Sequence, residues 1–217
     1  MSQYPEARFL LSVNKPGQFP PDIGGEVAFA GRSNAGKSSA INAIVNRRQF
    51  ARVSKTPGRT QLVNFFSLGR HRRLVDLPGY GFARVPEAMR QHWGTLLQAY
   101  FERRTSLTGL VLVVDARRLL TAFDWQLLRL ADSVSAPVHV LLTKADKLKR
   151  GQATDALRAA GKDLGGIATV QLFSATSKVG IDEARERMEF FLGSGRHEEA
   201  GPNSEHEQRA KKTRVPR

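Results

Sequence analysis

Short apolar runs alternate with longer amphipathic segments along most of the chain. Residues 27–30, 109–115 and 138–142 are short, nearly continuous apolar runs, which is typical of strands buried on both faces. Between them lie segments with apolar residues at helical spacing, such as residues 87–104 and a last segment that begins near residue 181. This alternation predicts an α/β fold, with a mainly parallel central sheet and helices on both faces.

Weaker patterns complete the predicted element order. Residues 61–68 and 72–76 are predicted strands joined at Gly69, and residues 169–173 form another. Helices are expected over residues 124–133, where Asp124 is a capping residue, and near residues 154–164. Helical spacing also places two sets of side chains on core-facing surfaces: Met89, Trp93, Leu96 and Tyr100, and then Ile181, Ala184, Met188 and Phe191.

Three regions follow from this reading. Residues 1–25 are a lead-in, in which residues 9–11 pack on the body and residues 16–25 form a loop. Residues 26–192 form the α/β domain. Residues 193–217 are polar, with almost no apolar side chains, and are expected to be a disordered basic tail.

The first apolar run leads directly into a phosphate-binding motif. Residues 31–39 are Gly31, Arg32, Ser33, Asn34, Ala35, Gly36, Lys37, Ser38 and Ser39, and they fit the pattern G-x-x-x-x-G-K-[ST]. Glycines let backbone N–H groups approach a polyphosphate, and the following helix adds its positive end. Lys37 is predicted to reach the β- and γ-phosphates, and Ser38 to hold Mg²⁺.

A second motif follows residues 73–75, another short apolar run. It consists of Asp76, Leu77, Pro78 and Gly79. An acid at a strand end can hold a Mg²⁺-bound water, and the Gly79 N–H can meet a γ-phosphate and move away when that phosphate leaves. Alone this motif is weak, because D-x-x-G also describes many turns.

Two further motifs indicate which base is bound. The first is Thr143, Lys144, Ala145 and Asp146, and the second is Ser174, Ala175 and Thr176. The Asp146 carboxylate can accept both N1–H and the 2-amino group of guanine, a donor pair that adenine lacks. The Lys144 stem covers the base, and a backbone N–H of the second motif can meet guanine O6. The four motifs in this order, each after an apolar strand, predict binding of GTP and GDP.

Length and composition limit the class of protein and its expected location. A chain of 217 residues suits one α/β domain with tails, and the absence of Cys excludes disulfide and thiol chemistry. No apolar run approaches the roughly 18 residues that span a membrane. The first residues show no basic start followed by an apolar stretch, so no signal peptide is expected and the cytoplasm is the default location.

The chain is strongly basic, with a formal net charge of +14. The last nine residues hold five basic side chains, and removing these charges still leaves +9 on the rest. The basic residues cluster in three regions: Arg47, Arg48, Arg52, Lys55 and Arg59; Arg70, His71, Arg72 and Arg73; and Arg103, Arg104, Arg117 and Arg118. Contact with RNA phosphates is favoured over a merely solvated surface and over an anionic membrane, and no DNA partner is expected.

Together these motifs resemble the EngB (YihA/YsxC) family of bacterial GTPases, within the TrmE–Era–EngA–EngB group. The distinctive parts are residues 57–61, Pro-Gly-Arg-Thr-Gln, and residues 76–81, Asp-Leu-Pro-Gly-Tyr-Gly. The resemblance covers residues 7–192. It implies a GTPase switch in assembly of the large ribosomal subunit, whose precursor, with its rRNA and ribosomal proteins, is the partner. It also implies a role in normal cell division and septation.

The resemblance assigns roles to further residues. It makes Ser38 and Thr60 the Mg²⁺ ligands, and Asp76 an acid that acts on the metal through water. The first switch is Gly58, Arg59, Thr60, Gln61 and Leu62. Lys37, Thr60 and Gly79 form the catalytic set. The form Thr-Lys-Ala-Asp in place of Asn-Lys-Ala-Asp leaves Thr143 to brace the phosphate-binding loop, less well than Asn does.

Hydrolysis by the isolated chain is expected to be slow. Tyr80 occupies the position where many GTPases place a Gln that orients the attacking water, and its hydroxyl is too far out for that task. A partner is therefore expected to complete the site. Related GTPases with Asn at the position of Asn34 bind K⁺ there; the alternative is that Asn34 is a tolerant loop residue.

Two classes of function stay open. The first is a GTP-gated switch that docks on a pre-ribosomal particle and leaves after hydrolysis. The second is a nucleotide-responsive RNA-binding module in which hydrolysis is incidental. A P-loop kinase is disfavoured, because the sequence shows no acceptor-site acid and no lid segment. A monomer is expected.

Overall fold

The computed structural model describes residues 4–51, 62–81 and 87–193, and a seven-stranded sheet forms its centre. The strand order is β1-β3-β4-β2-β5-β6-β7. The strands are β1 (Arg8–Val13), β2 (Gly25–Gly31), β3 (Val63–Gly69), β4 (Arg72–Asp76), β5 (Leu107–Asp115), β6 (Val138–Thr143) and β7 (Thr169–Leu172). The α-helices are α1 (Lys37–Val45), α2 (Glu87–Arg103), α3 (Ala122–Ser133), α4 (Arg150–Leu164) and α5 (Ile181–Gly193).

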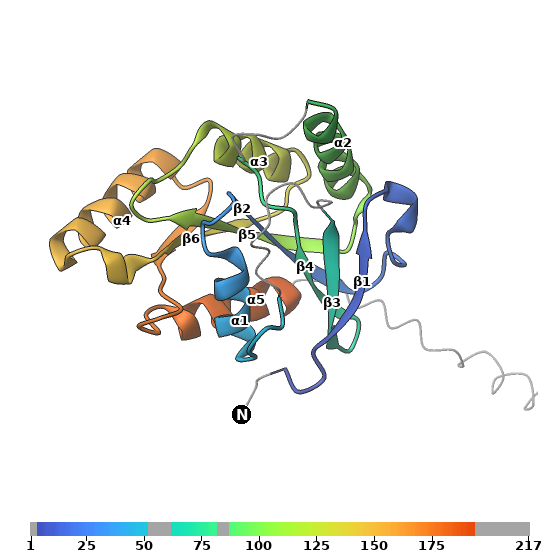
Figure 1. Ribbon diagram of the computed structural model, residues 1–217, viewed down its shortest axis with the longest axis horizontal. Helices are drawn as coiled ribbons and strands as arrows, with labels where there is room; N and C mark the ends of the chain where they lie inside the picture. The colour runs from blue at the N-terminus through green and yellow to red at the C-terminus, as the bar shows by residue number, and fades with distance from the viewer. Residues whose placement is uncertain (1–3, 52–61, 82–86, 194–217) are drawn as a thin grey trace, which may run out of the picture.

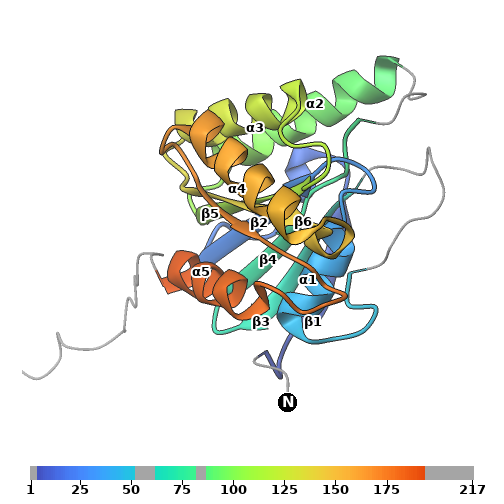
Figure 2. The same cartoon turned by 90° about the vertical axis from the view of Figure 1, so that its left-hand side faces the viewer.

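The helices form a layer on each face of the sheet, as predicted. Figures 1 and 2 show α2, α3 and α4 on one face and α1 with α5 on the other. Each layer has its own core. Leu96 and Tyr100 of α2 and Leu127 of α3 belong to the first core, and Ile41 of α1 and Met188 of α5 to the second. The sheet is thus covered on both sides, which explains why its central strands read as continuous apolar runs.

The strand directions bring the motif-bearing loops together. Strands β4, β2, β5, β6 and β7 run parallel, while β1 and β3 are antiparallel to their neighbours. The carboxyl ends of the parallel strands therefore meet at one edge of the sheet. In open α/β sheets this edge is where ligands bind.

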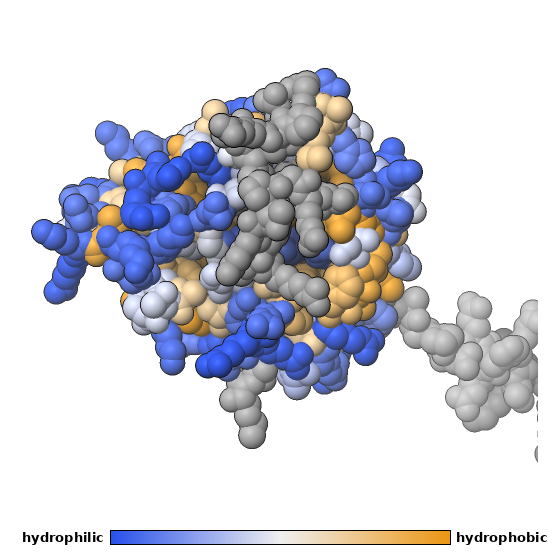
Figure 3. Space-filling model, viewed as in Figure 1, coloured by the Kyte–Doolittle hydropathy of each residue, from blue (hydrophilic) through white to orange (hydrophobic). Residues whose placement is uncertain are grey.

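The predicted lead-in is in part an edge strand. Residues 8–13 pair with β3 and so belong to the domain rather than preceding it. The register shifts between Phe9 and Leu11, and such a bulge breaks the alternation of period two by which a strand is recognised. Phe9 and Leu10 stay exposed, and Figure 3 shows hydrophobic side chains along this edge of the sheet.

Other boundaries differ by a few residues. The N-cap of α3 is Thr121, and Asp124 is the third helical residue, whose carboxylate accepts the Thr121 N–H at 2.7 Å. Asp124 therefore closes a capping box instead of starting the helix. Helix α4 begins at Arg150, before the expected start near residue 154, because the side chain of Gln152 accepts the Lys149 N–H at the helix start.

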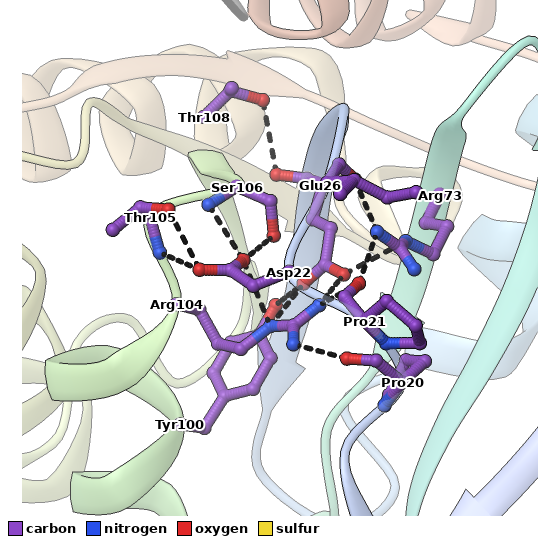
Figure 4. A network of polar contacts seen from close by, with 11 residues as sticks. Pro20, Pro21, Asp22, Glu26, Arg73, Tyr100, Arg104, Thr105, Ser106 and Thr108 are labelled. Carbon is purple, nitrogen blue, oxygen red and sulfur yellow. Dashed lines mark hydrogen bonds and ion pairs between the residues drawn. The ribbon is translucent and has the colours of Figure 1, made fainter.

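A buried ionic network joins β2, β4 and the end of α2 (Figure 4). It lies near the amino ends of β2 and β4, whereas the motifs follow the carboxyl ends of the strands. The Glu26 carboxylate is fully buried. It lies 2.9 Å from Nε of Arg73 and accepts hydrogen bonds from Arg104, including one of 3.2 Å from its Nε. The Tyr100 hydroxyl donates to the same carboxylate at 3.2 Å. Carbonyls of the preceding loop, such as those of Pro20 and Pro21, accept further hydrogen bonds from the two guanidinium groups.

Asp22 extends this network to the start of β5. Its carboxylate accepts the backbone N–H and hydroxyl of both Thr105 and Ser106. Although burial raises its pKa, these hydrogen bonds lower the pKa of Asp22 to about 2. The loop before β2 is therefore fixed to the β5 strand by an ionised side chain at neutral pH.

Several residues of the three basic clusters stabilise the fold. Arg73 and Arg104 are buried in the network. Arg47 donates to two backbone carbonyls of the N-terminal segment, and Arg72 pairs with Glu189 at 2.9 Å. By contrast, Arg118 is exposed beside the motif edge of the sheet.

Removal of the central carboxylate charge tests the network. The substitution Glu26→Gln is expected to lower the free energy of unfolding by about 3 kcal/mol, because two buried guanidinium groups lose their counter-charge. Asp155→Asn is a matched control, since its ion pair with Arg158 is fully at the surface. Denaturant unfolding measures both. A loss for Glu26→Gln as small as the control's would contradict a structural role for the network.

Candidate functional site

The four predicted motifs lie at the carboxyl ends of β2, β4, β6 and β7. The phosphate-binding loop, residues 31–38, runs from β2 into the first turn of α1, where Ser38 and Ser39 lie. Residues 76–79 end β4, residues 143–146 end β6, and residues 174–176 follow β7. Elements far apart in the sequence thus supply one continuous rim of loops, as the resemblance implies.

The phosphate-binding loop has the backbone shape that its glycines allow. Gly36 is the N-cap of α1, with a φ of 103° that disfavours any side chain. A Cβ on Gly31 would lie 2.5 Å from the carbonyl oxygen of Val113 on β5. Asn34 also has a positive φ, 62°, a conformation that Asn tolerates better than most residues. The phosphate-binding loop leads directly into the first turn of α1, and N–H groups at the start of a helix are well placed to bind an anion.

The base-reading motif holds the phosphate-binding loop from outside. The Thr143 hydroxyl lies within hydrogen-bond reach of the carbonyls of Ala35 and of Val114, the latter at 3.0 Å. Lys144 Nζ donates to the Asn34 carbonyl and lies 3.0 Å from Oδ2 of Asp115. The C=O and N–H of a trans peptide point in opposite directions, so the contact of Thr143 with the Ala35 carbonyl turns the Gly36 N–H away from Thr143. Thr143 therefore does brace the loop, through its hydroxyl.

Lys37 and Asp76 pair with each other at the centre of the rim. Lys37 Nζ forms an ion pair with Oδ1 of Asp76, and both side chains are about nine-tenths buried. The Asn64 amide approaches the other carboxylate oxygen at 3.5 Å. The two groups predicted to act on the phosphates and the metal are thus adjacent, each neutralising the other.

The residues present fit a magnesium ion. The donors at this point are the Asp76 carboxylate and the Ser38 side chain in the first turn of α1, and Mg²⁺ prefers such hard oxygen ligands. Nucleotide phosphates usually complete its shell, so a cage made by the protein alone is not needed. Within the described ranges there is no cluster of three or more His, Cys, Asp or Glu that could hold a metal without such phosphates. Thr60, the other expected ligand, lies outside the described residues.

The segment after β4 is attached to the phosphate-binding loop. The Leu77 N–H donates to the Phe29 carbonyl at 2.9 Å, and the Ser33 N–H donates to the Tyr80 carbonyl at 2.7 Å. A Cβ on Gly79 would lie 3.5 Å from the Ser33 backbone, an ordinary contact distance. Gly79 therefore lies against the loop that is predicted to hold the phosphates.

Tyr80 is buried and its hydroxyl is in use. It donates a hydrogen bond to Oδ1 of Asp124 in the first turn of α3, and its ring stacks on Phe123 with centroids 5.8 Å apart. Burial, with the nearby Asp124 carboxylate, raises the pKa of Tyr80 well above its usual value. The hydroxyl is therefore neither free to orient water nor able to act as a base, and the bond ties the segment after β4 to α3.

The predicted guanine-reading groups also meet. The Ser174 hydroxyl donates to Oδ1 of Asp146 at 2.6 Å, and Lys147 Nζ lies 3.3 Å from the other oxygen. The Ser174 hydrogen bond, the largest effect, lowers the pKa of Asp146 and keeps the carboxylate an acceptor. The Ser174 N–H already donates to the Val179 carbonyl at 2.9 Å, so the predicted contact of this motif with guanine O6 would come from the N–H group of Ala175 or Thr176.

Comparisons with known proteins agree with this geometry. A family model described as "50S ribosome-binding GTPase" matches residues 26–144. The "Probable GTP-binding protein EngB" of Nitrosococcus oceani is 53% identical over 197 residues, which are 89% of this chain and 98% of that protein. The chain belongs to the EngB family of GTP-binding proteins. The protein of the same name from Nitrosomonas europaea is 51% identical over 192 residues, 87% of this chain and 86% of that one.

Solved structures show the same fold. The crystal structure of a probable EngB GTP-binding protein has a TM-score of 0.64 at 21% identity, and the match covers 78% of this chain and 99% of that chain. Era from Aquifex aeolicus gives a TM-score of 0.62 at 18% identity, over 79% of this chain and 58% of Era. Membership of the EngB family makes this chain a GTPase, and its P-loop G-domain fold is as predicted.

Part of the predicted site and the predicted tail lie outside the described residues. Gly58, Arg59, Thr60 and Gln61 of the first switch lie outside the described residues, and Leu62 directly precedes β3. The predicted tail, residues 193–217, also lies outside them except for Gly193, which ends α5. Among the helices that the structure describes, none is long and apolar enough to cross a membrane.

The sequence reading missed one site residue. Asp115 ends β5, and its carboxylate accepts hydrogen bonds from Nε and Nη2 of Arg117 at 2.9 and 2.7 Å, as well as from Lys144. The Arg117 bonds, then those of Lys144, hold the pKa of Asp115 far below its usual value. An acid at a strand end, two residues before an Arg, was the available signal.

The contact between Ser174 and Asp146 can be tested directly. Ser174→Ala is expected to weaken GDP binding about tenfold, because a hydrogen bond to a charged group is lost and Asp146 is no longer oriented. Calorimetric titration with GDP measures the change. Ser133→Ala is the control, since that hydroxyl only contacts the Leu130 carbonyl on the surface of α3. Unchanged GDP affinity in Ser174→Ala would show that the hydroxyl does not position the carboxylate.

Proposed function

We propose that this EngB-family GTPase is a nucleotide-controlled switch in assembly of the large ribosomal subunit. It acts in the cytoplasm, as a monomer, and supports normal cell division and septation. The description of its family as ribosome-binding and the net charge of +14 support a partner rich in RNA. The observation that carries the switch is the Ser33 N–H to Tyr80 carbonyl bond, which joins the phosphate-binding loop to the segment after β4.

In this proposal, nucleotide binding rearranges the ion pair at the centre of the site. Lys37 leaves Asp76 for the β- and γ-phosphates, which offer more negative charge, while N–H groups of the loop and of the first turn of α1 donate to the same phosphates. Ser38 and Thr60 would hold Mg²⁺, with Asp76 acting on it through water, and the ion would supply positive charge to neutralise the phosphates. The residues that bind the nucleotide are those named above in the four motifs and the first switch.

Release of the γ-phosphate is coupled to the segment after β4. Gly79 lies against Ser33, so its N–H is near the proposed place of a γ-phosphate, and residues 58–62 are the proposed first switch. Because the Tyr80 hydroxyl is held by Asp124, the described residues supply no group that can activate water at this position. We therefore propose that intrinsic hydrolysis is slow and that the ribosomal particle accelerates it.

A bound K⁺ ion near Asn34 is a further part of the proposal. Because the φ of Asn34 is positive, replacement by Ala would also strain the loop, and Asn34→Gly is the cleaner test. GTP turnover by the unsubstituted chain is expected to be at least several-fold faster in K⁺ than in Na⁺ at equal ionic strength, since a fixed cation stabilises the developing charge. Asn34→Gly should remove the difference in turnover between K⁺ and Na⁺. A difference that is unchanged by the substitution would contradict a K⁺ site at the Asn34 side chain and leave Asn34 only its place in the backbone conformation of the loop.

Sedimentation with purified large ribosomal subunits tests the function itself. At moderate salt, the chain is expected to co-sediment with the subunits when a non-hydrolysable GTP analogue is bound, and much less when GDP is bound. The reason is that only the analogue retains the γ-phosphate. Asp146→Asn is the control, since it loses the guanine acceptor and should abolish the difference between nucleotides. Equal association with both nucleotides would instead favour the alternative, an RNA-binding module in which hydrolysis is incidental. No association would refute both.

A further inference from the structure

A cavity of about 380 Å³ lies beside the phosphate-binding loop, on the side facing α3. Its walls are the loop residues 32–35, the end of β5 with residues 117–119, and the first turn of α3. It shares residues 32–35 and Lys144 with the predicted nucleotide site. Lys37, Ser38 and Asp146, the groups predicted to meet the phosphates, Mg²⁺ and guanine, do not line it. The cavity thus borders the nucleotide site and extends from the start of the phosphate-binding loop toward α3.

Positive charge predominates in its lining. Four cations, Arg32, Arg117, Arg118 and Lys144, face two carboxylates. The Asp115 carboxylate is already taken by Arg117 and Lys144. Asp124 accepts hydrogen bonds from Tyr80 and from the N–H and hydroxyl of Thr121, at 2.7 and 2.6 Å for the latter two. The acids are therefore engaged within the walls, and the lining keeps an excess of two positive charges.

Two of the four cations are arginines whose guanidinium groups are available to a ligand. Within the described ranges, neither Arg32 nor Arg118 forms an ion pair or a side-chain hydrogen bond. The Arg32 side chain lies over Gly81, where a Cβ would approach it to 2.9 Å, so the glycine makes room for it. Arg118 is exposed at the mouth of the cavity, beside Arg117, whose side chain is 46% exposed. Such guanidinium groups are well suited to the paired oxygens of a phosphate.

We propose that this cavity binds a backbone phosphate of RNA. The inference deepens the proposed function by naming a contact point for the RNA of the ribosomal particle. A cavity of this volume admits a phosphate together with part of its sugar, and the excess of positive charge matches a phosphodiester. The wall at Gly81 and Asp124 is linked through Tyr80 to the phosphate-binding loop. In this proposal, a change of bound nucleotide therefore alters the position of this wall.

Arg118→Glu tests the proposal, because Arg118 lines the cavity and has no place in the nucleotide site. The probe is a mixed-sequence single-stranded RNA oligonucleotide, titrated against the full chain with the non-hydrolysable GTP analogue bound. We expect about tenfold weaker binding and a salt dependence reduced by about one phosphate contact. Arg129→Glu is the matched control: it makes the same charge change at an exposed position of α3 outside the cavity, and should have little effect. GDP affinity should be equal in both variants and the unsubstituted chain, which shows that both are folded.

Each outcome decides a separate point. Equal losses in the two variants, or no loss in either, would overturn the cavity as the site. Binding of inorganic phosphate that is lost in Arg118→Glu, without any effect on RNA binding, would identify a site for a free anion and overturn RNA as the occupant. Co-sedimentation with large subunits that is unaffected by Arg118→Glu would overturn this contact and leave the proposed function standing. If the unsubstituted chain does not bind large subunits at all, the proposed function is refuted, whatever the result for the cavity.

Discussion

Two carbonyl groups of the phosphate-binding loop, those of Asn34 and Ala35, are held from outside by Lys144 and Thr143. A loop rich in glycine has many accessible conformations, and ordering it costs roughly 1–2 kcal/mol of entropy per residue. The contacts of Thr143 and Lys144, which come from the end of a different strand, offset part of that cost. The loop is therefore ordered by the protein itself, and the same two residues link it to the motif that is predicted to read the base.

The ion pair of Lys37 and Asp76 solves a related problem. Both side chains are almost buried, and a buried charge without a partner is strongly destabilising. Each group compensates the other, and a nucleotide with its cation offers replacement partners of the correct sign to both. The hydrogen bonds of Tyr80 have a comparable role, because its carbonyl contacts the phosphate-binding loop and its hydroxyl contacts α3. These two contacts connect the phosphate-binding loop to the start of α3.

The positive charge of the chain has two distinct uses. Arg73 and Arg104 are buried around Glu26, and Arg47 binds backbone carbonyls of the N-terminal segment. These three side chains therefore stabilise the fold. Arg118 and Arg32 have no such role within the described residues, and both line the same cavity. A count of basic residues in the sequence cannot make this distinction, because it depends on which carboxylates and carbonyls the fold brings within reach.

The sequence determined the order of elements and the identity of the nucleotide. Buried parallel strands require apolar runs, and phosphate and guanine recognition need particular groups at strand ends, so residues 31–38, 76–79 and 143–146 could be recognised without coordinates. Short-range patterns did less well where a bulge interrupts alternation, as in β1, or where a cap is formed by a residue and its third neighbour, as with Thr121 and Asp124. Only the tertiary structure decided the pairing of Glu26 with Arg104, the hydrogen bond of Tyr80 to Asp124 and the cavity between the phosphate-binding loop and α3. Each of these joins residues more than forty positions apart, and no local pattern of polarity can encode which distant strand or helix will be adjacent.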